Sequence, residues 1–118
     1  MREINFDITN VETTTDGNKI YIAVDWVGDE SKVDNLFIDL LDSEHELIDD
    51  CIYPKPRHTF YVHDYQLDLL CEQKNEFAFY VAMYDRVINE ADGSYSKNEL
   101  LASKGPFKVS LENALSNV

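Results

Sequence analysis

Three histidines and one cysteine carry the strongest metal-binding chemistry in this sequence. His45, His58 and His63 supply imidazoles and Cys51 supplies a thiol, and both groups suit zinc. Their spacings match no recurrent ligand pattern, and a histidine in a turn or on the polar side of a strand is usually a solvated side chain. The carboxylates are plentiful but irregularly spaced, which also argues against a calcium loop. We therefore expect no metal and no other cofactor.

Motifs of catalysis are missing from the sequence. It contains no GxGxxG, GxxxxGKS/T, HExxH, GxSxG or DxDxDG stretch, and its four glycines leave little material for a phosphate-binding loop. We expect a protein that is not an enzyme, with no catalytic residues.

The cysteine count is also informative. Cys51 and Cys71 are too few for a disulfide scaffold and do not form a CxxC pair, so reduced structural thiols are the favoured interpretation. A bridge between them requires Cα atoms within about 7 Å, which the sequence leaves open.

The distribution of charge is the feature that a generic domain does not explain. The 118 residues carry a net charge of −13. Residues 1–50 hold 14 acids and 3 bases, a net of −11, whereas residues 51–118 hold 9 acids and 7 bases, a net of −2. Between positions 25 and 50 a single base, Lys32, stands among ten acids: Asp25, Asp29, Glu30, Asp34, Asp39, Asp42, Glu44, Glu46, Asp49 and Asp50.

A surface with this charge repels nucleic acids and membranes and accelerates encounter with basic proteins. We therefore expect no direct nucleic-acid or membrane binding, and a basic protein as partner, such as a nucleic-acid-binding protein. Carboxylates two apart on a strand lie about 6.7 Å apart on one face and can imitate phosphate spacing. Solubility alone is the simpler interpretation. The predicted partner-binding residues are six acids and one aromatic anchor: Asp39, Asp42, Glu44, Glu46, Asp49, Asp50 and Tyr53.

Alternation of apolar and polar residues predicts a chain built from strands. Residues 4–8 and 20–26 alternate around a turn at 15–18, which predicts a β-hairpin in the first 27 residues. Residues 36–41 and 46–48 flank the turn-like segment 42–45 and predict a second hairpin. The segment 31–43 also fits helical spacing, with Ser31 as a cap, and this alternative stays open beside the strand.

The second half of the chain continues the pattern. Pro54 and Pro56 predict an edge or a crossing between sheets. Strands are expected over 59–65, 76–84 and 107–111, with 76–84 central because both of its faces are apolar. Short helices are possible near 65–72 and 111–118, and the polar segment 85–104 is expected to form a long hairpin loop with a turn at Asp92.

Seven short strands favour one antiparallel β-sandwich domain spanning 1–118. The details resemble a fibronectin type III or immunoglobulin-like module, in which the second strand ends on a buried Trp, here Trp26. In that family a Leu precedes an alternating strand, similar to Leu70 followed by Phe77, Phe79 and Val81. The proline that usually follows the Leu is missing, and Phe77 stands where the family has its corner Tyr. The resemblance implies binding and not a reaction.

Size and charge are similar to those of small acidic inhibitors encoded by phages, including anti-CRISPR proteins and other mimics of DNA. The alternative is a structural or accessory module of a phage particle or surface assembly, which binds its neighbour through a sheet edge and the 85–104 loop. No apolar run approaches the roughly 18 residues of a membrane-spanning helix, and residues 1–8 lack the pattern of a secretory signal. We therefore expect a cytoplasmic protein.

Overall fold

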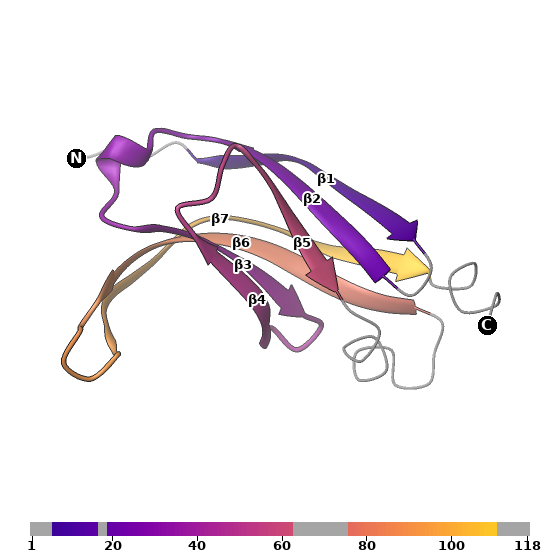
Figure 1. The fold of residues 1–118 in the computed structure, drawn as a ribbon. Coiled ribbons are helices and arrows are strands. Elements are labelled where there is room, and N and C mark those ends of the chain that lie inside the picture. The colour runs from indigo at the N-terminus through magenta and orange to yellow at the C-terminus, as the bar shows by residue number, and fades with distance from the viewer. Residues whose placement is uncertain (1–5, 17–18, 63–75, 111–118) are drawn as a thin grey trace.

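The computed structural model describes residues 6–16, 19–62 and 76–110, which form a β-sandwich of two antiparallel sheets (Figure 1). One sheet has the strand order β1-β2-β5 and the other has the order β4-β3-β6-β7. These elements confirm the predicted all-β sandwich. Their bounds are β1 Asp7–Asp16, β2 Lys19–Val27, η1 Glu30–Lys32 (a 3-10 turn), β3 Leu36–Asp42, β4 Leu47–Ile52, β5 Arg57–Val62, β6 Glu76–Ile88 and β7 Tyr95–Ser110.

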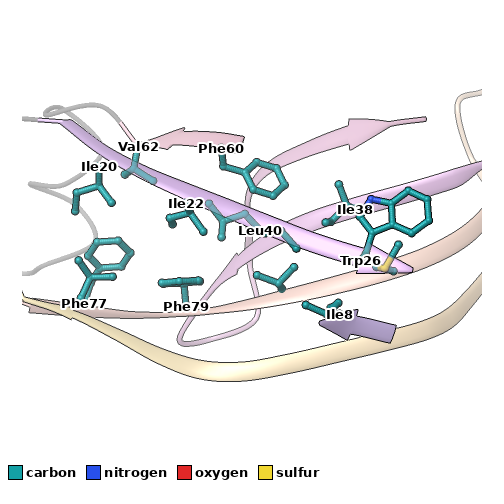
Figure 2. Close-up of a cluster of buried hydrophobic side chains, with 14 of the residues drawn as sticks. Ile8, Ile20, Ile22, Trp26, Ile38, Leu40, Phe60, Val62, Phe77 and Phe79 are labelled. Atoms are coloured by element: carbon teal, nitrogen blue, oxygen red, sulfur yellow. The ribbon is translucent and has the colours of Figure 1, made fainter. Parts of the chain in front are cut away.

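Alternating side chains from both sheets form the core between them (Figure 2). Strand β2 buries every second residue and pairs with both β1 and β5, which confirms the first predicted hairpin. Trp26, near the end of β2, is 4% exposed and belongs to the core. The fully buried side chains with the largest volumes are Phe60, Phe79, Ile8, Ile20, Ile22, Leu36, Ile38, Leu40, Met83, Val24 and Val62.

The helix considered over 31–43 is wrong, and the strand is correct. Only η1 is helical in this region, and the Asp29 carboxylate caps it by accepting from the Ser31 amide at 3.0 Å. Strand β3 then buries each of its residues from Leu36 to Leu41, on both faces of the sheet. Burial on both faces removes the polar alternation that normally marks a strand, and the remaining apolar spacing imitates a helix.

The second predicted hairpin, β3 to β4, is confirmed, and its turn is held by one carboxylate. Asp42 accepts hydrogen bonds from the backbone amides of Glu44 and Glu46, each at 2.9 Å. The Asp42 amide donates to the Glu46 carbonyl at 2.8 Å, and His45 adopts a φ of 65°. This local network fixes the conformation of the turn that carries Glu44 and Glu46.

The long loop predicted over 85–104 is wrong in extent. Strand β6 continues to Ile88 and β7 begins at Tyr95, so that only residues 89–94 connect them. The predicted turn at Asp92 is present, with Gly93 at a φ of 73°. Polar residues remain in the strands because they pair with one another: Arg86 with Asn98 at 2.9 Å, and Lys97 with Asp85 at 2.7 Å.

Some predictions concern residues outside the described ranges. These are the short helices near 65–72 and 111–118, the turn residues 17–18, the metal candidate His63, the bridge candidate Cys71, and Leu70 of the family resemblance. Cys51 carries a free thiol. The predicted crossing at Pro54 and Pro56 is confirmed, because the chain leaves β4 in one sheet there and enters β5 in the other.

Trp26 ties β2 to this crossing, and its replacement tests the contact. Its indole Nε1 donates to the Lys55 carbonyl at 2.7 Å. Trp26→Phe keeps a ring in the core but leaves that part-buried carbonyl without its donor, so we expect a loss of about 1–3 kcal/mol in the free energy of unfolding. Urea denaturation measures the loss. The control Tyr61→Phe alters an exposed ring and should change stability by less than about 0.5 kcal/mol. Equal effects of the two changes would contradict the prediction.

Candidate binding surface on the four-stranded sheet

The four-stranded sheet has an outer face that points away from the three-stranded sheet (Figure 1). Leu36, Ile38 and Leu40 of β3 point into the core, so their neighbours in sequence point outward. The outward residues Phe37 and Leu41 are nevertheless 5% and 9% exposed. Side chains lying across the sheet therefore cover its central strands on this face.

The centre of the outer face is a buried ion pair. Arg86 of β6 binds Asp39 of β3 through two hydrogen bonds, at 3.1 and 2.7 Å, and its guanidinium lies 5.0 Å from the ring centre of Phe37, 4.3 Å from that of Tyr84 and 5.0 Å from that of Tyr95. Burial acts to lower the pKa of Arg86, but the hydrogen bonds and charge of Asp39 outweigh it and raise the pKa.

Asp39, one of the predicted partner-binding residues, belongs to this buried pair. Its side chain is buried and both of its oxygens are bound to Arg86. A carboxylate held in this way cannot exchange its cation for a partner's lysine or arginine without leaving Arg86 buried and uncompensated.

Other acids of the 25–50 segment are also paired with distant bases. Asp25 binds Arg57 at 3.0 Å, and Asp34 binds Lys97 at 3.1 Å. Lys97 also binds Asp85, which is fully buried and accepts from the backbone amide of Asp34 at 2.9 Å. The acid-rich segment is therefore partly neutralised by the second half of the chain.

The acids around the β3–β4 turn are in a different situation. Within the described ranges, no lysine or arginine forms an ion pair with Glu44, Glu46, Asp49 or Asp50, and all four are exposed. We call these four residues the acidic hairpin. Their charge also affects a neighbouring group. Burial raises the pKa of the Cys51 thiol, and the charges of Asp49 and Asp50 raise it further.

The remaining predicted residues lie apart from one another. Asp42 is tied into the turn as described above. Tyr53 is 60% exposed but follows the far end of β4, where its amide donates to the Leu36 carbonyl at 2.8 Å and its hydroxyl donates to Asn35. Because Leu36 and Asp42 are opposite ends of β3, the structure does not bring Tyr53 to the acidic turn.

The arrangement of carboxylates bears on the idea of phosphate spacing. Asp49 and Asp50 are consecutive in β4, so their side chains point to opposite sides of the sheet. Burial lowers the pKa of His58 in β5, and the charge of Asp49 partly offsets this decrease. The acidic hairpin is thus a cluster around a turn and an edge strand, and not a row along one strand.

Sequence reasoning missed the apolar part of this surface. Leu47 and Ile52 of β4 are 57% and 42% exposed, and Leu100 of β7 is 54% exposed. Leu47 is paired with Leu41, and Ile52 with Phe37, both on the outer face. The sequence signal for this surface was an apolar residue at a position of the edge strand whose side chain points outward.

The described residues also bear on metals and membranes. They contain no group of three or more His, Cys, Asp or Glu side chains that could hold a metal ion. None of the helices in the described part of the chain has both the length and the apolar character to cross a membrane.

Comparisons with known proteins give a likeness of fold only. No protein-family model matches the chain, and no curated protein matches it. Among solved structures it is similar to β-glucuronidase from Ruminococcus gnavus, in the apo form (15% identity, TM-score 0.48) and in complex with uronic isofagomine (14% identity, TM-score 0.49). Each match covers 92% of this chain but 16% of the glucuronidase chain. At this level the likeness assigns neither a family nor an activity.

The ion pair predicts an asymmetry between single and double substitutions. Arg86→Met or Asp39→Leu alone leaves one buried charge unpaired, so each should lower the free energy of unfolding by about 3–5 kcal/mol. The double variant removes both charges and should be more stable than either single variant. A double-mutant cycle by urea denaturation measures this coupling, and additive losses would contradict a coupled pair.

The buried Asp85 predicts acid sensitivity. Burial acts to raise the pKa of Asp85, but hydrogen bonds from Lys97 and from the amides of Asp34 and Asn35 outweigh it and lower the pKa below the usual 3.8. Ionised Asp85 therefore stabilises the native state above the unfolded-state pKa, and this contribution is lost as the pH falls through the folded-state value.

Comparison with Asp85→Asn checks this sign. The variant should be less stable than the native chain at pH 7, and the gap should narrow as the pH falls below about 4. Urea titrations at pH 7, 5, 4 and 3 measure it. A gap that stays constant over this range would show that the ionisation of Asp85 contributes nothing.

Proposed function

We propose that this chain is a non-catalytic binding protein that engages a basic protein surface through its acidic hairpin. The observation that carries the proposal is the separation of the acids into two groups. Asp25, Asp34 and Asp39 are neutralised within the chain, whereas the acidic hairpin keeps four exposed carboxylates without a cation from the described residues.

The physical consequence is a local negative potential on a rigid support. It attracts lysine and arginine side chains and repels phosphate groups of nucleic acids and lipids. In this mechanism the carboxylates occupy basic groups of the partner and make them unavailable to other ligands. A nucleic-acid-binding protein has such a basic surface and is the partner class we favour, and inhibition of that protein is the expected effect.

The fold supports a binding role. Strand order β1-β2-β5 against β4-β3-β6-β7, with Trp26 buried near the end of β2, supports the resemblance to fibronectin type III and immunoglobulin-like modules. Such sandwiches act mainly as scaffolds for surfaces, so the resemblance favours recognition over catalysis. We also propose a cytoplasmic location, because two cysteines are too few for the disulfide scaffold that many small secreted domains have.

A second candidate is a structural module that binds its neighbour through the end of the β6–β7 hairpin. One observation favours it. Strand β3, which pairs with β6, begins at Leu36, opposite Asp85. Strands β6 and β7 therefore continue past the end of β3, and their hairpin projects from the rest of the sandwich (Figure 1). Ile88 and Tyr95 at this projection are 40% and 48% exposed.

Affinity capture with matched variants tests the two candidates. The first variant neutralises the acidic hairpin through Glu44→Gln, Glu46→Gln, Asp49→Asn and Asp50→Asn. The control also removes four negative charges, but at the opposite end of the strands, through Glu30→Gln, Glu90→Gln, Asp92→Asn and Glu99→Gln. Because the attraction is electrostatic, basic proteins retained by the native chain at low salt should be lost at high salt and lost with the first variant, but kept by the control.

The opposite pattern favours the second candidate. In that case retention is independent of salt and survives neutralisation of the acidic hairpin. It is lost when residues 89–94 are replaced by an Asn-Gly turn, which closes a two-residue hairpin and removes the tip of the projection. Retention of the same proteins by both four-charge variants at high salt would contradict the electrostatic proposal.

A further inference from the structure

A pocket lies on the outer face next to the acidic hairpin. It has a volume of about 280 Å³. Its lining residues from β3, β6 and β7 include Leu41, Tyr80, Tyr84 and Leu100, and His45 of the β3–β4 turn also contributes. Small-molecule sites usually measure roughly 300–1,000 Å³, so this pocket suits one large side chain of a partner.

The walls of the pocket are built by specific features of the backbone. His45 has a positive φ and stacks on Tyr80, with ring centres 4.2 Å apart and planes 27° apart. Across from it, the pairing of β6 with β7 shifts register between Phe79 and Val81. At this irregularity Gly105 has a φ of 138°, and a Cβ there would lie 2.7 Å from the Tyr80 ring. The glycine therefore allows β7 to approach Tyr80 closely.

We infer that this pocket receives an arginine side chain of the basic partner, an inference that rests on the proposed function. Charge favours a cationic occupant, because His45 lies between Glu44 and Glu46 of the acidic hairpin. The pocket lining includes one lysine, Lys104, and its ammonium is paired with the Asp7 carboxylate of β1 at 3.9 Å, which partly offsets its charge. A second copy of this chain is a poor occupant, since each copy carries a net charge of −13.

The same sheet face already binds one arginine by this chemistry. The guanidinium of Arg86 lies over Tyr84 at 4.3 Å and is paired with a carboxylate, Asp39. Tyr84 also lines the pocket, so a second guanidinium there would meet an aromatic wall. The exposed Glu44 and Glu46, which flank the lining residue His45 in the sequence, supply the negative charge. Arginine is preferred to lysine because its planar guanidinium is weakly hydrated and stacks on rings, whereas an ammonium is strongly hydrated.

Short peptides of defined sequence test the inference with the full chain. The probe is a glycine-serine peptide with two flanking lysines and a central arginine, labelled for fluorescence anisotropy. Three comparison peptides carry citrulline, lysine or phenylalanine at the centre. The native chain should bind the arginine peptide about tenfold more tightly than the citrulline peptide, and also more tightly than the other two.

Two variants should remove this preference. Tyr80→Leu takes away the ring against which His45 stacks, and Ser103→Leu fills the pocket from an exposed position with little risk to folding. Matched controls on the outer face of the three-stranded sheet are Tyr61→Leu and Thr14→Leu, which should keep it. Thermal unfolding curves establish that each variant is folded.

The outcomes separate this inference from the proposed function. Equal binding of the arginine and citrulline peptides, or tighter binding of the phenylalanine peptide, overturns the arginine pocket. If binding then still falls with salt and with neutralisation of the acidic hairpin, the proposed function stands. Failure of every peptide to bind also overturns the pocket. In that case the capture experiment with the four-charge variants decides the proposed function separately. An arginine preference that is lost with Tyr80→Leu and Ser103→Leu but kept by both controls supports the inference.

Discussion

The ion pair between Asp39 and Arg86 determines what the outer face of the four-stranded sheet can be. A charged pair on an open sheet would normally be hydrated, yet both side chains here are below a tenth exposed. The rings of Phe37, Tyr84 and Tyr95 exclude water from the guanidinium, and the guanidinium in turn holds these rings across β3, β6 and β7. Desolvated charges require their partner to stay in place. The face is therefore rigid at its centre. The exposed groups that a partner could contact lie at its margins, on the β3–β4 turn and the edge strand β4.

The sequence was sufficient for the architecture because the core depends on local alternation. The period of two in β2, β6 and the two hairpins follows from side chains that lie between two sheets, and each strand shows it without reference to its neighbours. Alternation fails where both faces are buried, as in β3, and where polar residues pair across strands, as Lys97 does with Asp85. In these places the burial or pairing of a residue depends on a neighbour far away in the chain, and a local sequence pattern does not contain that neighbour.

The candidate site was predicted less well, for the same physical reason. A run of acids predicts a negative surface only if bases elsewhere do not reach it. Arg57, Arg86 and Lys97 come from distant positions and neutralise Asp25, Asp39 and Asp34, and nothing in the spacing of these acids distinguishes them from the others. The sequence offers Tyr53 as an aromatic anchor, but a strand of six residues separates it from the turn. The pocket beside Tyr80 needs a register shift and a glycine conformation that only the folded chain specifies.

In the function proposed above, charge and shape contribute differently to recognition. Exposed carboxylates on a turn contribute mainly to the rate of encounter, because water and salt weaken each contact once it is formed. Selectivity therefore requires a second element that excludes water, and the aromatic pocket next to His45 is placed to provide it. A lysine-rich partner would be attracted by the acidic hairpin as strongly as an arginine-rich one, and on our proposal the pocket distinguishes them. The rigid centre of the sheet matters here, because Tyr84 belongs both to the Arg86 site and to the pocket wall, so its position is fixed before any partner arrives.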